Sequence, residues 1–357
     1  MEKIVFLFPY PISFAPSQRF RFEQYFSILK LNNVKFKTFS FLSEKAWNIY
    51  HQKGNVLLKF LYICMSFFKR FSHLFSILNA KYVFIHRETA PIGPPIFEFI
   101  IAKILRKKII YDFDDAIWLE NYNENNKMFQ KLKYYSKVKK IIKWSYKVSV
   151  GNEYLAKYAK QFNSNVVLNP TTIDTENYHN PALFNIEKFD KLTIGWTGTA
   201  TTNKYLKFLI PILEKLALKH DFYFNVISDQ EPNFALKNLI FTKWHKNTEI
   251  IDLLRFDIGV MPLTDDKWAK GKCGFKALQY MSLGIPAIVS PVGVNLDIVD
   301  HGINGFIADT EDEWFTVLDQ FLSNSSQFDE MGKKARQKII ECYSIKSNTQ
   351  NFLSLFS

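Results

Sequence analysis

Apolar residues along this chain form two kinds of pattern, and the two kinds alternate twice. Short apolar or strictly alternating runs are typical of strands in a sheet. Between them, apolar residues recur every three or four positions, which is typical of helices packed on a sheet. The predicted strands are residues 4–8, 34–41, 82–86, 108–111 and 146–150, and later 192–198, 222–228, 238–244, 257–263 and 287–290. Strands that alternate with helices in this way indicate an α/β fold with a parallel sheet, formed twice.

A polar segment separates the two halves of the pattern. Residues 171–190 lack periodicity and contain Pro181, so they are typical of a linker. A chain of 357 residues also suits two domains of ordinary size. The sequence therefore predicts an N-terminal domain over residues 1–170 and a C-terminal domain over residues 191–344.

Polar residues stand at the ends of two strands of the first domain. His86 and Arg87 close one predicted strand, and Asp112, Asp114 and Asp115 follow the next. Open α/β sheets bind their ligands at the carboxyl ends of the strands, so these residues are candidates for a site. Three carboxylates within four positions repel one another. One of them therefore holds a proton, binds a metal or pairs with an arginine, and the sequence leaves all three options open.

The first predicted helix begins near Ser17 with two cations. Arg19 and Arg21 fall in its first turns, where the helix dipole disfavours positive charge unless an anion lies opposite. Together with Arg87, these arginines bind an acceptor phosphate or neutralise the aspartates. The pattern supports both interpretations equally.

Two turns of the second domain combine glycine with lysine at the start of a helix. Lys272 and Gly274 precede a helix that begins at Phe275, and Gly198 leads into a helix that contains Lys204. Free backbone N–H groups, the helix dipole and a lysine together favour phosphate. The alternative is a solvated lysine cluster in front of an ordinary core helix. Two such termini in one domain favour a diphosphate ligand over either turn alone.

Charge and cysteine content narrow the class of partner and the compartment. Lys and Arg number 46 against 34 Asp and Glu, a formal net charge of +12, which favours an anionic partner. The three cysteines have no metal-ligand spacing and indicate a reducing compartment. The first residues lack the features of a signal peptide, so a cytoplasmic protein is expected.

Two segments combine apolar or aromatic residues with basic ones. Residues 56–78 are too often interrupted by Lys59, Lys69 and Arg70 for a membrane span, so they form a helix that packs on the sheet or lies in a membrane surface. Residues 127–147 predict a helix with a basic stripe. This stripe is a solvated face or an attraction site for anionic lipid or a phosphorylated acceptor, and nucleic acid remains an alternative.

Several motifs in a fixed order resemble a known family. GFKALQYMSLGIPAIVSPVGVN, with HGINGFIAD after it and IGWTG and NKYLKFLI before it, resembles the nucleotide-sugar half of family 4 of the retaining glycosyltransferases. APSQRFRFEQY and YDFDDAIW extend the resemblance over nearly the whole chain. It implies the GT-B architecture, two Rossmann-like parallel-sheet domains that face a cleft. It also implies that the C-terminal domain binds a nucleoside-diphosphate sugar and the N-terminal domain the acceptor, with residues 345–357 packing back on the N-terminal domain.

The resemblance assigns roles in donor binding to several residues, and this chain departs from the family's motif at some of these positions. Gly198 and Lys204 match the family's glycine and diphosphate lysine, but Thr199 stands at the position of its usual diphosphate arginine. Of the family's paired glutamates, one corresponds to Gln279, which still accepts hydrogen bonds from ribose hydroxyls. The other falls near Gly271.

Sugar recognition therefore passes to other groups in this chain. Lys272 or the backbone amides of Gly274 and Phe275 are the candidates.

The resemblance also implies a mechanism. Lys204 and Lys272 stabilise the charge that develops on the leaving nucleoside diphosphate, so no metal or other cofactor is expected. Asp114 is the first candidate to take the proton of the acceptor hydroxyl, with Asp112 or His86 next. If the enzyme retains configuration, the leaving phosphate itself takes that proton. The alternative, a metal-binding Asp-x-Asp motif of the other nucleotide-sugar transferase architecture, is disfavoured by the two parallel-sheet domains.

The sequence thus predicts a metal-independent, retaining glycosyltransferase that acts on a polysaccharide, lipopolysaccharide or lipid-linked acceptor. It is expected in the cytoplasm, with peripheral contact to the inner membrane face and with no nucleic-acid partner. An epimerase or hydrolase of nucleotide sugars with the same fold is one alternative, and it would need no acceptor. A non-catalytic binder of polyanions or nucleic acid is another, and its binding would depend steeply on salt.

Overall fold

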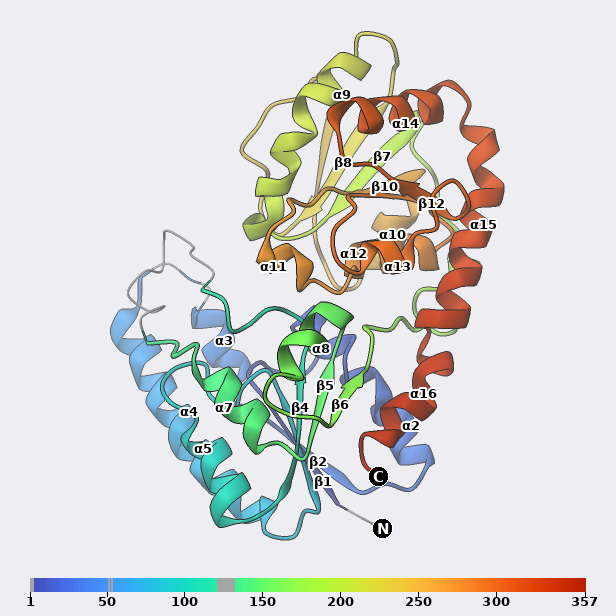
Figure 1. Cartoon of the computed structure of the whole chain (residues 1–357). Helices are drawn as coiled ribbons and strands as arrows, with labels where there is room; N and C mark the ends of the chain where they lie inside the picture. The colour runs from blue at the N-terminus through green and yellow to red at the C-terminus, as the bar shows by residue number, and fades with distance from the viewer. Residues whose placement is uncertain (1–2, 51, 53, 121–131) are drawn as a thin grey trace. The chain divides into compact units, whose positions relative to one another are not determined.

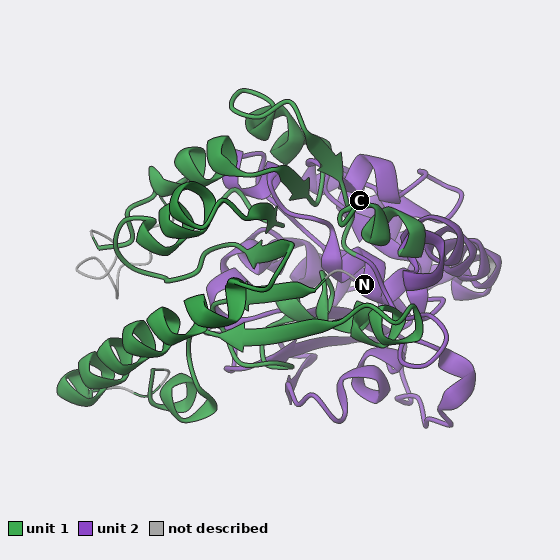
Figure 2. Ribbon diagram, turned by 90° about the horizontal axis from the view of Figure 1, so that it is seen from below, with its two compact units in different colours: residues 1–171, 349–357 green, residues 172–348 purple. Residues whose placement is uncertain are grey.

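The computed structural model describes residues 3–50, 52, 54–120 and 132–357, and the chain divides into two compact units (Figures 1 and 2). Unit 1 comprises Met1–Thr171 and Thr349–Ser357, and unit 2 comprises Thr172–Asn348. Each unit contains one six-stranded sheet whose strands all pair in parallel. The predicted α/β class with two Rossmann-like domains is therefore confirmed.

The sheet of unit 1 has the order β2-β1-β3-β4-β5-β6. Its strands are β1 (Ile4–Phe8), β2 (Phe36–Ser40), β3 (Tyr82–His86), β4 (Lys108–Phe113), β5 (Lys147–Val150) and β6 (Val166–Leu168). Every residue of β1, β3 and β5 is buried. Because both faces of these strands are buried, all their positions favour apolar residues, and the sequence shows them as continuous apolar runs.

The helices of unit 1 are α1 (Pro16–Arg19), η1 (Glu23–Tyr25), α2 (Phe26–Leu31), α3 (Glu44–Tyr50), α4 (Val56–Ile77), α5 (Ile96–Phe99), η2 (Ile100–Ile104), α7 (Lys137–Trp144) and α8 (Glu153–Ala159). The single helix predicted from Ser17 is broken into α1, η1 and α2. Arg21 and Phe22 lie in the break, and both are buried because the chain turns their side chains toward the sheet.

The sheet of unit 2 has the order β12-β11-β10-β7-β8-β9. Its strands are β7 (Thr193–Thr197), β8 (Tyr223–Ser228), β9 (Leu239–Lys243), β10 (Ile258–Met261), β11 (Ala287–Val289) and β12 (Gly305–Ile307). Trp196 on β7 and Trp314 are the largest side chains of the core cluster on this sheet, and both are almost completely buried.

The helices of unit 2 are η4 (Pro181–Leu183), η5 (Ala200–Phe208), α9 (Ile210–Leu216), α10 (Glu249–Leu254), α11 (Lys267–Lys270), α12 (Phe275–Ser282), α13 (Asn295–Ile298), α14 (Glu311–Ser323), η6 (Ser325–Phe328), α15 (Asp329–Lys338) and η7 (Ile339–Tyr343). The one helix predicted after Gly198 is thus a 3-10 helix followed by an α-helix. Pro211 stands in the first turn of α9, where a proline starts a helix but does not continue one.

The two unit boundaries differ from the expected ones. Residues 172–190, expected as a linker, belong to unit 2, where Ile173 and His179 are completely buried. Arg336 on α15 fixes this segment, because it donates hydrogen bonds to the carbonyl oxygens of His179 at 3.0 Å and Thr175 at 3.1 Å. A polar, aperiodic sequence gave no sign of these backbone contacts.

The last helix, α16 (Ile345–Ser354), returns the chain to unit 1 from Thr349 onward. Phe352 stacks on Tyr25 with a centroid distance of 4.1 Å, and Lys147 donates to the carbonyl oxygen of Ser354 at 2.6 Å. The C-terminus is therefore part of the core of unit 1.

Strand order gives each sheet a point where successive connections leave in opposite directions. In unit 2, β7 lies between β8 and β10, and in unit 1, β1 lies between β2 and β3. Loops at the carboxyl ends diverge at such a point and leave room for a ligand. The turn after β7 and the loop after β10 flank it in unit 2, and the loops after β1 and β3 flank it in unit 1.

Candidate functional site

The turn after β7 is built around Gly198. A Cβ on this residue would lie 2.2 Å from a ring carbon of buried Trp196 and 2.7 Å from Thr202 Oγ1, so only glycine fits. Thr202 Oγ1 accepts a hydrogen bond from the backbone amide of Thr199 at 3.0 Å, which closes the first turn of η5. Asp229, after β8, accepts from the amide of Ala200 at 2.7 Å. The turn is thus held rigidly at the carboxyl edge of the sheet.

Lys204 projects from η5 next to the loop that follows β10. The side chain is exposed, and its ammonium group lies 5.0 Å from the centroid of the Tyr205 ring. Burial alone would raise the pKa of Asp266 in that loop, but hydrogen bonds from Thr264 and backbone amides, with the charge of Lys204, lower it. Lys204 and the carboxylate of Asp266 are therefore electrostatic neighbours across the point where the connections diverge.

The start of α12 lies on the connection after β10, the strand next to β7, at the same carboxyl edge of the sheet. Gly274, at the N-cap, has a φ of +66°, and a Cβ there would lie 2.2 Å from Ile298, so the tight entry to the helix requires glycine. Lys276 in the first turn lies over the ring of Trp196 at 5.4 Å. Lys272 and Phe275, beside the same turn, are both partly exposed. The predicted donor residues Gly198, Lys204, Lys272, Gly274 and Phe275 therefore all belong to the two connections that leave β7 and β10 at the carboxyl edge of one sheet.

Gln279, which is predicted to accept hydrogen bonds from ribose hydroxyls, lies on α12. Its side chain is buried, and its Nε2 atom lies 3.5 Å from an oxygen of Glu249 and 3.4 Å from Nε2 of His179. Glu249, the first residue of α10, also accepts hydrogen bonds from Tyr178 Oη at 2.9 Å and Trp244 Nε1 at 3.3 Å. Sequence reasoning missed Glu249, because only the packing of α10 on α12 brings a carboxylate next to the glutamine.

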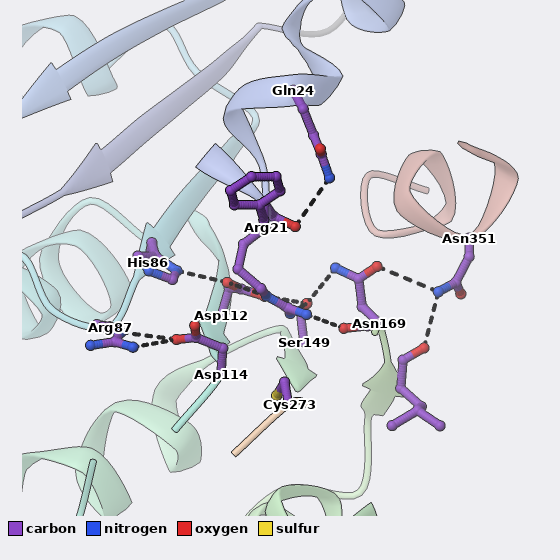
Figure 3. A network of polar contacts seen from close by, with 12 residues as sticks. Arg21, Gln24, His86, Arg87, Asp112, Asp114, Ser149, Asn169, Cys273 and Asn351 are labelled. Carbon is purple, nitrogen blue, oxygen red and sulfur yellow. Dashed lines mark hydrogen bonds and ion pairs between the residues drawn. The ribbon is translucent and has the colours of Figure 1, made fainter. Parts of the chain in front are cut away.

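In unit 1, the strand ends hold a buried network formed by Arg21, His86, Asp112, Ser149 and Asn169 (Figure 3), which we call the Asp112 network. Strand register places His86 beside Asp112 and Asp112 beside Ser149. His86 Nδ1 lies 2.8 Å from Asp112 Oδ2, and Ser149 Oγ donates to Asp112 Oδ1 at 2.6 Å.

Arg21 closes the Asp112 network with its guanidinium group. It forms an ion pair with Asp112 and donates to the carbonyl oxygen of Asn169. Burial alone would raise the pKa of Asp112, but the charge of Arg21 and the hydrogen bond with His86 hold it far below its usual value.

This geometry argues against the proton-transfer roles predicted for Asp112 and His86, and it favours one of the two roles left open for Arg21. Asp112 and His86 have no exposed surface, and the lowered pKa of Asp112 makes its carboxylate a weak base. Arg21 is equally buried and neutralises Asp112, which is one of the two roles that the sequence left open for it. The sequence placed Asp112 beyond the end of a strand, whereas β4 runs to Phe113 and keeps it inside the sheet.

Arg87, after β3, binds the two remaining carboxylates. Its guanidinium donates to Asp114 Oδ1 at 2.9 and 2.7 Å and also forms an ion pair with Asp115. Burial alone would lower the pKa of Arg87, but these two carboxylates raise it strongly. Asp114 and Arg87 retain 13% and 20% of their side-chain exposure, so this pair reaches the surface where the Asp112 network does not. Arg19, predicted with Arg87 as an anion ligand, is mostly buried and lies over the Phe20 ring.

A small cavity of about 30 Å³ lies beside Arg87, between the loops after β1 and β3, with Tyr10 and Lys133 in its lining. Burial raises the pKa of Tyr10 to about 12, so it is a neutral hydroxyl. Lys137 forms an ion pair with Glu88 at 2.7 Å and is almost completely buried. Lys137 is therefore not an exposed member of the predicted basic stripe. Residues 127–131 of that stripe lie outside the described residues.

Among the described residues, no group of three or more His, Cys, Asp or Glu side chains is arranged to hold a metal ion. The aspartates of the YDFDD segment instead pair with arginines: Asp112 pairs with Arg21, and Asp114 and Asp115 pair with Arg87. Pairing with an arginine was one of the three options that the sequence left open for these carboxylates.

Comparison with known proteins identifies the domain of unit 2. Residues 191–324 match the family model described as "Glycosyl transferases group 1". A segment of 88 residues is 33% identical to a sucrose synthase of Melioribacter roseus, and this match covers 23% of the chain and 11% of that protein. The prediction of a glycosyltransferase is confirmed at the level of this domain.

Solved structures share the fold of the whole chain. A glycosyltransferase from Rickettsia africae has a TM-score of 0.71 at 16% identity, with 99% of this chain and 97% of that chain covered. The sucrose-phosphate synthase of Thermosynechococcus elongatus gives 0.69 at 11% identity, with 100% and 98% covered. Anabaena HepE, solved in complex with UDP and glucose, gives 0.63 at 11% identity, with 99% of each chain covered. These similarities confirm the predicted GT-B architecture. Assignment to family 4 and the altered glutamate motif stay predictions.

Proposed function

We propose that this chain, whose residues 191–324 form a glycosyl transferases group 1 domain, transfers a sugar from a nucleoside-diphosphate sugar to a glycan or lipid-linked acceptor. The observation that carries the proposal is the carboxyl edge of the unit 2 sheet. There a glycine that cannot be replaced, Gly198, leads into a turn with the exposed Lys204, opposite the glycine and lysine at the start of α12. A diphosphate, as carried by a nucleoside-diphosphate sugar, is the ligand that this arrangement favours.

Positive charge at this edge of the sheet favours departure of the nucleoside diphosphate from the donor sugar. Lys204 and Lys272, with the amides at the start of α12, stabilise the charge that develops on the leaving diphosphate. Because lysines provide this charge, we expect the transfer to proceed without an added metal. Gln279 is the group we expect nearest the ribose, and Glu249, whose carboxylate lies 3.5 Å from the Gln279 amide, positions it.

The acceptor half is assigned to unit 1. Asp114 is the carboxylate we expect nearest the acceptor hydroxyl, because it reaches the surface and Arg87 fixes its orientation with two hydrogen bonds. In a retaining reaction the leaving phosphate takes the proton and Asp114 only orients the hydroxyl. We place the enzyme in the cytoplasm, in peripheral contact with an anionic membrane that carries its acceptor.

A thermal-shift panel of nucleoside diphosphates and nucleotide sugars, without added metal, tests the donor site. Ligand at a hundred times its dissociation constant is expected to stabilise the protein by about 2.7 kcal/mol. A shift with one nucleotide class would support the proposal and identify the base. If no compound shifts the unfolding temperature, with or without Mg²⁺, the proposed donor site is wrong and the non-catalytic binder gains support.

Gly198→Ala is expected to destabilise the protein by about 1–3 kcal/mol and to weaken nucleotide binding at least tenfold. The new methyl group would overlap the ring of Trp196, so the turn that carries Lys204 has to move. Denaturant unfolding and nucleotide titration measure the two effects. Gly302→Ala is the control: its φ is +75° and no atom lies within 4 Å of the added Cβ, so it should lose some stability but keep its nucleotide affinity. Equal losses of affinity in both variants would contradict the role of the turn.

A further inference from the structure

Helix α4 is apolar on two faces, and the described residues pack against only one of them. Its inner face packs Tyr62, Ile63, Phe67 and Leu74 against a buried cluster of unit 1. The outer face carries apolar side chains at alternating spacings of four and three residues: Leu57, Leu61, Cys64, Phe68, Phe71, Phe75 and Leu78. Phe68 and Phe75 are each 76% exposed, which is unusual for phenylalanine. A continuous apolar stripe of this length marks an interaction surface.

The stripe continues across the neighbouring helix and encloses a cavity. Figure 1 shows α5 and η2 beside α4 on one side of unit 1, and Phe71 contacts Phe97 with a centroid distance of 4.8 Å. Between α4 and η2 lies an open cavity of about 420 Å³, lined by Phe71, Ser72, Leu74, Phe75, Leu78, Ile100 and Leu105.

The cavity offers a ligand almost nothing to hydrogen-bond. Ser72 supplies the only polar side chain of the lining, and its hydroxyl is already bonded to the carbonyl oxygen of Lys69 at 2.8 Å. A sugar or a nucleotide would lose its hydrogen bonds to water there, whereas an alkyl chain would not.

Every charged side chain of α4 and of residues 100–107 is basic. Lys69, Lys103, Arg106 and Lys107 flank the stripe, and none of these four makes an ion pair with another described residue. Lys107 donates to the carbonyl oxygen of Leu78 at 2.7 Å, which holds its ammonium group at the end of α4 beside the cavity. Residues 54–81 contain no Asp or Glu, and Glu98 on α5 is buried. An anionic surface therefore meets no exposed carboxylate on α4, α5 or η2.

We propose that α4 and η2 form a docking surface for an anionic membrane, in which the cavity holds one acyl chain of an anionic phospholipid and the flanking cations hold its headgroup phosphate. The apolar stripe lies at the depth of the acyl chains, and the lysines and arginine lie at the level of the phosphates. In the part of the chain that the structure describes, no helix is long and apolar enough to cross a bilayer, so this contact lies in the surface of one leaflet. The inference is independent of the donor chemistry in unit 2.

Vesicle flotation of the full chain tests the surface. Binding is expected to vesicles that contain phosphatidylglycerol and to be at least tenfold weaker to pure phosphatidylcholine. Phe68→Ser with Phe75→Ser should lower binding at least tenfold without changing the unfolding temperature, because both side chains are mostly exposed. Leu218→Ser, at a position that is 87% exposed in unit 2, is the matched control and should bind as the wild type does.

A second experiment distinguishes binding of an alkyl chain in the cavity from nonspecific hydrophobic binding to the apolar face. Dodecyl phosphate below its micelle concentration should bind, and inorganic phosphate at the same concentration should bind at least tenfold more weakly. Ser72→Phe fills the cavity while adding apolar surface, so it should lose at least tenfold in dodecyl phosphate affinity. If this variant binds as well as or better than the wild type, the cavity is not a chain site and the proposal fails.

Other outcomes would also overturn the membrane assignment. One is wild-type protein that does not float with anionic vesicles at low salt, and another is binding that the double serine variant retains. A third is a concentration-dependent dimer, seen by sedimentation without lipid and lost in the double serine variant, which would assign the stripe to a second copy of the chain. None of these results involves a nucleotide, so a failure here leaves the glycosyltransferase proposal standing.

Discussion

Asp112→Asn is expected to lower the free energy of unfolding by about 3–5 kcal/mol, the largest loss of stability that we predict for a single substitution. The asparagine keeps the shape of the side chain but leaves the guanidinium of Arg21 buried without its counter-charge. The hydrogen bonds from His86 and Ser149 lose their charged acceptor at the same time. Urea unfolding at neutral pH measures the effect.

Acidification should reproduce part of this loss in the wild type. The pKa of Asp112 lies far below that of an aspartate in an unfolded chain, which is about 3.9. The folded state therefore binds the proton later than the unfolded state, and the stabilisation is complete above the unfolded pKa. It is lost as the pH falls from there toward the folded pKa. Asp112→Asn should consequently show a flatter decline of stability below pH 4 than the wild type.

Asp114→Asn serves as the matched control for the Asp112 substitution. Asp114 also pairs with an arginine, but Arg87 keeps Asp115 as a second carboxylate, and both partners reach the surface. A loss of about 1 kcal/mol or less is expected. If the two substitutions cost the same, burial of the Asp112 network does not determine its contribution to stability. If Asp112→Asn is neutral, the charge in this network stabilises nothing.

The Asp112 network illustrates what the sequence revealed and what it did not. The apolar runs identified the strands, and the parallel order followed from their alternation with helices. It was therefore predictable that His86 and the aspartates would meet at one sheet edge. Which aspartate is buried depends on where β4 ends, and the strand runs two residues past its apolar run because Asp112 finds a partner on each neighbouring strand. Where polar side chains determine the end of a strand, the apolar pattern of the sequence does not show where the strand ends.

Long-range partners limited the prediction in unit 2 in a different way. Glycines and lysines near helix starts are local features, so Gly198, Lys204 and Gly274 were recognisable one by one. Glu249 lies thirty positions before Gln279, and only helix packing brings the two together. The linker predicted over residues 171–190 has the same limit: Arg336 binds backbone carbonyl oxygens in this segment, and such contacts cannot be recognised from the sequence.

Lys204→Ala is expected to lower kcat by about 10²–10³-fold if the lysine contacts the diphosphate, the usual effect of removing one donor that stabilises developing charge. Stability should change by less than about 0.5 kcal/mol, because the side chain is exposed. The assay is sugar transfer or donor hydrolysis with the nucleotide identified by thermal shift. Lys204→Arg should recover part of the rate, since it restores the charge with a different shape.

Lys207→Ala is the matched control, because Lys207 is an exposed lysine one turn further along the same helix. Its activity should stay within twofold of the wild type, which would show that the effect at position 204 is local and not a change in net charge. The proximity of Lys204 to Asp266 adds a further constraint, since a lysine that served only to neutralise this carboxylate would affect loop stability and not kcat. A loss of kcat with unchanged stability is therefore the result that assigns Lys204 to the diphosphate. Activity of Lys204→Ala within twofold of the wild type would remove the lysine from the mechanism.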